Sequence, residues 1–141
     1  MTLPMILAPL FVLVLLTFVL GFWIPFNSVP LLRSGQVRVH DIDLRQPNWP
    51  RPVQQINNSY TSQFEQPVLF YVLTILAIIT KHADFLFVIM AWLFVLARLA
   101  HAYVHITSNN VNIRGPLFGI AALVLAIMWL IFIVRILLGL P

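Results

Sequence analysis

The sequence has no cysteine and little charge. Of its 141 residues, only 9% are charged. The missing cysteine excludes disulfides, a protein thiolate nucleophile and cysteine-bound zinc or iron–sulfur sites. Soluble domains have about a quarter of their residues charged, so the composition excludes an ordinary soluble domain. The formal net charge is +4, and the basic residues mostly flank apolar runs, so we expect no nucleic-acid partner.

Apolar residues are abundant instead, at 61% of the chain, and they form four runs. A bilayer core needs about 20 helical residues to cross it, and a spanning segment must satisfy its own backbone hydrogen bonds. The second run is long enough only if the polar stretch from Asn57 is also helical. We therefore predict an all-α integral membrane four-helix bundle, as a single domain over residues 1–141. The runs are approximately Leu3–Leu32, Val68–Thr80, Phe85–Ile106 and Leu117–Leu140.

The connections between these runs predict the orientation in the membrane. Loop 33–52 holds four arginines and loop 107–114 holds one, whereas the turn 81–84 holds a single lysine. Basic residues concentrate in cytoplasmic loops, so loops 33–52 and 107–114 should be cytoplasmic and both termini outside. In a bacterium this membrane would be the inner one. Pro116 suits the first turn of the fourth helix.

Polar residues interrupt the second run. Asn58, Ser62 and Glu65 recur at intervals of four and three, so they should share one helix face. Pro67 follows Glu65 and should bend the helix there, because proline lacks the backbone N–H. A polar face of this kind predicts contact with protein or a wet cleft.

The third run ends in ARLAHAYVHI, which places Arg98, His101 and His105 on one stripe. A charge deep in the bilayer costs about 2.5–3.5 kcal/mol even on the lenient insertion scale. Neither Arg98 nor Glu65 should therefore face lipid, and we predict that they pair inside the bundle. This pair is either part of a functional site or only a structural clasp between two helices.

Other chemistries have weaker support. His101 and His105 are spaced like metal ligands on a helix, but no third ligand is close in sequence, so we expect no metal site. Two histidines on one helix cannot bind opposite faces of a haem. Serines are present, but no acid is placed to orient a histidine for Ser-His-Asp hydrolysis.

Two segments resemble the MAPEG family, the membrane-associated proteins in eicosanoid and glutathione metabolism. The segments are FEQPVLFYVL in the second run and ARLAHAYVHI in the third, followed by Arg114 sixteen residues after Arg98. The resemblance covers most of the chain. It implies a homotrimer of four-helix bundles, with glutathione bound between neighbouring subunits near the cytoplasmic face. Lipid and a lipophilic small molecule are the other implied partners.

The resemblance also implies residue roles. Glutathione has two carboxylates and one ammonium, so its site needs guanidinium donors and a carboxylate. Arg114 matches the family's arginine beside the thiol and is the expected catalytic residue, because a nearby cation stabilises a thiolate. Its alternative role is a charge that holds its loop in the cytoplasm. The expected glutathione-binding residues are Glu65, Arg98, His101, Asn58, Ser62, His105 and either Arg33 or Arg38.

Three positions depart from the family pattern. Ser62 stands where many members have asparagine, and His105 and Phe118 stand where many enzymatic members have tyrosine. Two functions therefore remain. The first is a glutathione-dependent transferase or peroxidase acting on a lipophilic electrophile. The second is a non-catalytic protein, either a trimeric scaffold or an accessory subunit of a larger membrane complex.

Overall fold

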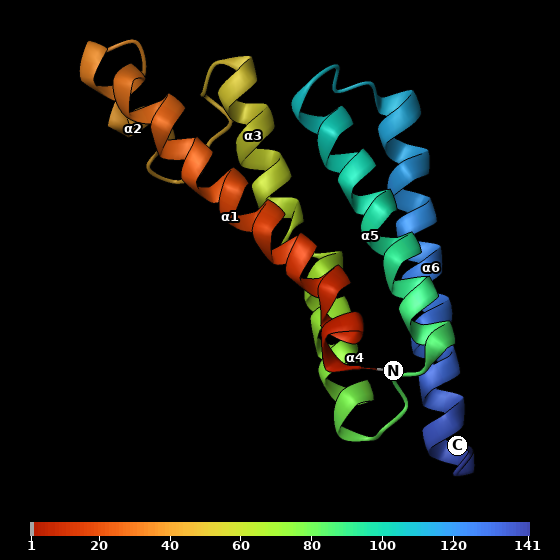
Figure 1. Cartoon of the computed structure of the whole chain (residues 1–141). Coiled ribbons are helices and arrows are strands. Elements are labelled where there is room, and N and C mark those ends of the chain that lie inside the picture. The colour runs from red at the N-terminus through yellow and green to blue at the C-terminus, as the bar shows by residue number, and fades with distance from the viewer. Residues whose placement is uncertain (1) are drawn as a thin grey trace.

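The computed structural model describes residues 2–141, and in this part of the chain all regular structure is helical (Figure 1). Four segments are long and apolar enough to cross a membrane, with α3 and α4 together forming the second. The predicted all-α fold with four spans is thus confirmed. The helices are α1 (Leu3–Ser34), α2 (Val39–Ile42), α3 (Arg51–Ser62), α4 (Gln66–Ile79), α5 (Phe85–Ile106) and α6 (Val111–Leu138).

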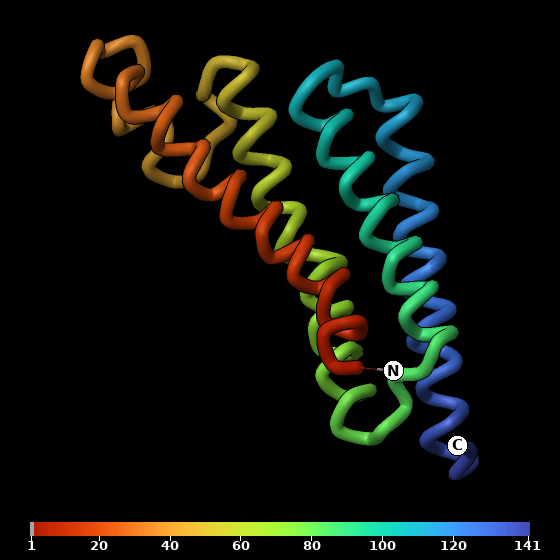
Figure 2. Tube along the Cα trace, viewed as in Figure 1, coloured from red at the N-terminus to blue at the C-terminus, as the bar shows by residue number. Residues whose placement is uncertain are grey.

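The spans run alternately up and down. Figure 2 shows both ends of the chain at the lower end of the molecule, while the α1–α3 connection and the α5–α6 connection lie together at the upper end. α5 is the central helix, because it packs along α6 and also contacts α1 and α3. The two arginine-containing loops therefore lie on the same side, as the orientation prediction requires.

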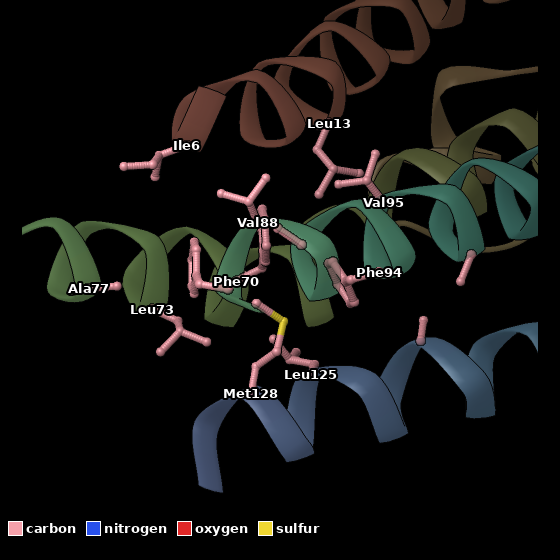
Figure 3. Close-up of a cluster of buried hydrophobic side chains, with 14 residues drawn as sticks. Ile6, Leu13, Phe70, Leu73, Ala77, Val88, Phe94, Val95, Leu125 and Met128 are labelled. Carbon is pink, nitrogen blue, oxygen red and sulfur yellow. The ribbon is translucent and has the colours of Figure 1, made fainter. Parts of the chain in front are cut away.

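The apolar core lies between α1, α4, α5 and α6 (Figure 3). Phe70 of α4 stacks on Phe94 of α5, with ring centroids 5.0 Å apart. Leu13 of α1 packs against this core from one side and Leu125 of α6 from the other. α1 and α6 bury only a narrow stripe each and leave most of their apolar side chains exposed, as helices facing lipid do.

The second span is broken at residues 63–65. α3 ends at Ser62, and the next three N–H groups donate to carbonyls three residues back, which tightens the chain into a turn. α4 then begins at Gln66 with Pro67 in its first turn. Pro67 lacks the N–H that would continue the helix, and its ring clashes with the preceding turn. The predicted bend is therefore a complete interruption, which begins at Gln63 and includes Glu65.

The fourth helix begins earlier than its apolar run. Asn110 caps it, because its side-chain oxygen accepts the N–H of Asn112 at 3.0 Å. α6 therefore starts at Val111, and the placement of Pro116 in the first turn was wrong: it lies in the second turn. Arg114 consequently belongs to the helix and has a defined direction.

The opposite end of the molecule is fastened by a capped ion pair. The Asp84 carboxylate accepts the N–H of Phe87 at 3.0 Å and pairs with Arg135 of α6 at 2.9 Å. Partial burial by itself raises the pKa of Asp84, but these two donors outweigh burial and leave that pKa below its usual value. The turn between α4 and α5 is thereby tied to the end of α6.

Candidate functional site

Arg98 has the largest fully buried side chain in the described part of the chain. Its side chain is 0% exposed, although it carries a guanidinium. It donates to the Ser62 hydroxyl at 2.7 Å, to the Ser62 carbonyl at 3.2 Å and to the Gln66 side-chain oxygen at 3.4 Å. Arg98 lies on the stripe of α5 that also buries Phe94 and His101, so the helix directs it against the break in the second span.

The predicted pairing of Glu65 with Arg98 was wrong. No ion pair joins them among residues 2–141, and Glu65 is exposed. The break provides the physical reason. A continuous helix would keep Ser62 and Glu65 on one face, whereas the turn at 63–65 leaves Ser62 and Gln66 facing Arg98 and directs Glu65 outward.

The two histidines extend the polar region along α5. His101 and His105 are both buried, with ring centroids 5.4 Å apart and the rings edge to face. The ring of Phe118 in α6 packs against the ring of His101, with ring centroids 5.8 Å apart. Gln55 of α3 donates to the carbonyls of His105 at 3.2 Å and of Thr107 at 3.1 Å, so α3 satisfies the free carbonyls at the end of α5.

Together these residues form what we call the polar cluster. Its members come from the inner face of α3, from the break and α4, and from α5. They are buried polar side chains within an apolar bundle, which is a costly arrangement unless they are hydrogen-bonded or bind something. The polar cluster consists of Gln55, Ser59, Ser62, Gln63, Gln66, Arg98, His101 and His105.

Several atoms of the polar cluster have no hydrogen-bond partner in the chain. Gln63 is 1% exposed, yet neither its amide nitrogen nor its oxygen is bonded. The Ser59 hydroxyl, the Arg98 Nε and the Nδ1 atoms of both histidines are also buried and unpaired. Proteins satisfy most buried polar atoms, so this concentration at one place marks a region able to bind water or a polar ligand.

Four members of the polar cluster were missed in the sequence. Gln55, Ser59, Gln63 and Gln66 recur at intervals of three and four, which was a usable signal. Their side chains are uncharged, whereas the opposite charge of Glu65 favoured it as the partner of Arg98. The period showed that these residues share a face, but only packing against α5 shows that this face is the buried one.

Arg114 lies near the polar cluster but outside it. It is half-buried in the first turns of α6 and donates to the side-chain oxygen of Asn109, whose backbone φ of 50° is left-handed. Phe118 lies four residues later, on the same face of α6, and contacts His101. Arg114 therefore stands on the loop side of the histidines, and no carboxylate pairs with it in residues 2–141.

The remaining predicted site residues lie elsewhere. Asn58 is exposed and accepts a hydrogen bond from Gln54 at 2.9 Å. Arg33 and Arg38 are exposed, at the end of α1 and just before α2, and neither bonds to the polar cluster. Within one chain, the structure therefore brings together Ser62, Arg98, His101 and His105, with Arg114 nearby. Within the described residues, no group of three or more His, Asp or Glu is placed to hold a metal.

Comparison with known families decides the classification. A model of the MAPEG family matches residues 6–134, which is nearly the whole chain. The chain belongs to the MAPEG family. The match covers most or all of each membrane-spanning segment and the whole polar cluster, and it confirms the resemblance seen in the sequence. Searches of curated proteins and of solved structures found no match. With its four apolar spans, this MAPEG chain fits a multi-pass integral membrane protein.

Proposed function

We propose that this MAPEG protein is a glutathione-dependent transferase or peroxidase that acts on a lipophilic electrophile. One observation carries the proposal: Arg98 at the break in the second span and Arg114 in the first turns of α6 lie on either side of the buried histidines, and neither is paired with a carboxylate in residues 2–141. Buried cations ordinarily have an anionic partner. A tripeptide with two carboxylates supplies such partners.

The exposed carboxylate of Glu65 supports a site between subunits. Glu65 stands at the middle of the second span, Arg51–Ile79, beside the exposed apolar residues Phe64 and Leu69. A carboxylate facing lipid at that depth is costly. In the proposed homotrimer a neighbouring subunit covers it, and Glu65 receives the ammonium of glutathione. Native mass spectrometry in mild detergent tests this assembly, and a monomer there would contradict it.

Arg114 is the proposed catalytic residue. A free thiol of this type has a pKa of about 8.5, and an adjacent guanidinium favours the thiolate. In the transferase reaction the thiolate sulfur forms a bond to the electrophilic carbon, while the bond from that carbon to its leaving group breaks and the leaving group departs with the electron pair. In the peroxidase reaction the thiolate attacks one peroxide oxygen, the O–O bond breaks and the alcohol leaves after taking up a proton, and a second glutathione then reacts with the sulfenic acid to give the disulfide and water. The apolar lipid-facing surfaces of α1 and α6 offer a route for the lipophilic substrate.

A non-catalytic scaffold or accessory subunit is the second candidate. It is favoured by the complete burial of Arg98, whose bonded nitrogens donate only to Ser62 and Gln66. A guanidinium held in this way acts as a clasp between α5 and the second span. His105 and Phe118, in place of the tyrosines of many enzymatic members, favour the same candidate.

Glutathione titration separates the two candidates. We expect calorimetry on the purified protein in detergent to detect glutathione binding, and a thiolate absorbance band to appear near neutral pH. Arg114→Lys keeps the charge but loses the planar fork, so the band should fall while affinity is largely kept. Arg135→Lys, at the opposite end of α6, is the matched control and should leave the band unchanged. Absence of any band at saturating glutathione would favour the scaffold.

The orientation belongs to the same proposal. We place loops 33–52 and 107–114 in the cytoplasm, which puts Arg114 and the mouth of the site there, where glutathione is available. In a bacterium the membrane is the inner one. This placement rests on the distribution of arginines between the two sides.

A further inference from the structure

The facing sides of α5 and α6 are packed in a regular register. The two helices are antiparallel and lie side by side, joined by the short loop that ends at Asn110 (Figure 1). Buried side chains on α6 recur at intervals of four and three, as do those on the facing stripe of α5. The ring contact between His101 and Phe118 shows which positions are level. Counting from it away from the loop places Phe94 level with Leu125, and both lie in the apolar core.

The same register places His105 level with Arg114. His105 lies four residues after His101, toward the loop, and Arg114 lies four residues before Phe118, toward the same loop. Both helices rise by the same amount per residue, so the two steps cover equal distances along the bundle. A step of four residues also keeps each side chain on its shared face. His105 and Arg114 therefore face each other at the loop end of α5 and α6.

One nitrogen of the His105 ring is available to a ligand. Nδ1 is buried and has no hydrogen-bond partner, whereas Nε2 is also unbonded in residues 2–141 but keeps some accessible surface. Gln55 holds the backbone carbonyl of His105 at 3.2 Å, and the His101 ring packs edge to face against its ring at 5.4 Å. With the hydrogen on Nδ1, the lone pair is on Nε2, which is the nitrogen that a thiol can reach.

The charged groups around His105 are both cations. Arg114 of α6 and Arg98 of α5 are the charges that act on it. α3 presents the neutral Gln55 to it, and the only titratable side chain of α1 is the exposed Arg33. A further positive charge on His105 is therefore repelled while the site is empty. Bound glutathione offsets this repulsion, because its two carboxylates match the two arginines and its thiolate matches an imidazolium.

We propose that Nε2 of His105 accepts the thiol proton of glutathione. The S–H bond breaks, its electron pair stays on the sulfur, and the thiolate lies beside the guanidinium of Arg114. The proton remains in the site on the imidazolium. This assignment rests on the proposed glutathione-dependent activity. It adds a proton acceptor, which Arg114 cannot be, because a guanidinium stays protonated in proteins.

The retained proton is used again in the peroxidase reaction. When the thiolate attacks one peroxide oxygen, the O–O bond breaks and the alcohol oxygen leaves with the electron pair. The imidazolium of His105 gives its proton to that oxygen and returns to imidazole. Histidine suits both steps, since an ordinary imidazole has a pKa of about 6.5. A tyrosine, which many enzymatic members have at this position, has an ordinary pKa of about 10 and is a poor base at neutral pH.

Proton counting tests the proposal. The purified protein in detergent is saturated with glutathione in weakly buffered solution near neutral pH. The thiolate is measured from its absorbance band and the released protons from a pH indicator. S-methylglutathione has no thiol, so it provides the baseline for the rest of the tripeptide. We expect almost no proton to be released per thiolate formed, and the band to change little around neutral pH, because thiol with imidazole and thiolate with imidazolium hold equal numbers of protons.

Replacing His105 should change the count. In His105→Gln the thiol proton has no acceptor in the site, so each thiolate should form with release of about one proton, and the band should rise about tenfold per pH unit below its midpoint. His105→Tyr should release the same number, so the test does not depend on one substitution being tolerated.

Two other histidines provide the comparisons. His101→Gln removes the neighbouring ring, which is level with Phe118 and not with Arg114. It can weaken glutathione binding, but the number of protons released per thiolate should stay that of the unmodified protein. His82→Gln, in the turn before α5, should change neither the band nor the count. If His101→Gln releases the proton and His105→Gln does not, the assignment to His105 is wrong.

The outcomes separate this assignment from the proposed activity. A thiolate band in the unmodified protein with about one proton released per thiolate would overturn the assignment alone and leave the activity in place. A band in His105→Gln that equals that of the unmodified protein at every pH would overturn it as well. Absence of any band at saturating glutathione would overturn the proposed activity and the assignment with it.

Discussion

The hydrogen bond between Arg98 and Ser62 should be the strongest interhelical coupling in the polar cluster. The perturbation is a double-mutant cycle with Arg98→Met, Ser62→Ala and the double variant. Methionine keeps much of the length of the arginine stem but has no donors. A second cycle, with Arg98→Met and Glu65→Gln, tests Arg98 with Glu65. These two residues have opposite charges but form no ion pair in this structure.

The expected magnitude follows from the geometry. A hydrogen bond to a charged group contributes about 1.5–3 kcal/mol in soluble proteins. Interhelical hydrogen bonds in membranes average about 0.6 kcal/mol and reach about 1.7, because the unfolded state also finds partners. The contact with the Ser62 hydroxyl is 2.7 Å long and Arg98 is 0% exposed, which favours the upper end, about 1.5 kcal/mol. Glu65 is exposed and unbonded, so its coupling should be below about 0.5 kcal/mol.

The assay is reversible unfolding in mixed micelles, with the free energy of unfolding measured for each member of both cycles. Neighbouring residues that interact give a non-additive cycle, and independent residues give an additive one. A Glu65 coupling equal to or larger than the Ser62 coupling would refute the reasoning. It would show that the break at 63–65 does not direct Glu65 away from Arg98 in the membrane.

Three further predictions concern other parts of the molecule. The pKa of Asp84 is lowered in the folded state, so its stabilising contribution is present above its unfolded pKa and is lost as the pH falls through the folded value; thermal melts from neutral to acidic pH should show this dependence, and Asp84→Asn should lack it. Asn110→Ala should lower the free energy of unfolding by about 1 kcal/mol through loss of the α6 cap, whereas Asn112→Ala should cost less in the same assay. A reporter that is active only in the cytoplasm, fused after Pro141, should stay silent, and a strong signal would reverse the orientation.

Much of the fold follows from the sequence alone. Four apolar runs with almost no charge leave few alternatives to four membrane helices, because lipid provides no partner for an unpaired backbone. The stripe of Arg98, His101 and His105 was also predictable, since residues three and four apart on one helix share a face wherever the helix is placed. The resemblance to the family was also visible in the sequence, because it rests on short local segments.

The partners of that stripe were decided by the tertiary structure. Opposite charge favoured Glu65 as the partner of Arg98, but the turn at 63–65 changes the direction of the chain and presents Ser62 and Gln66 instead. Helical periodicity shows which residues lie on the same face, but it does not show which face meets another helix. That choice depends on the packing of α3 against α5, which buries Gln55 and leaves Asn58 exposed, because each helix face can contact only the elements placed beside it.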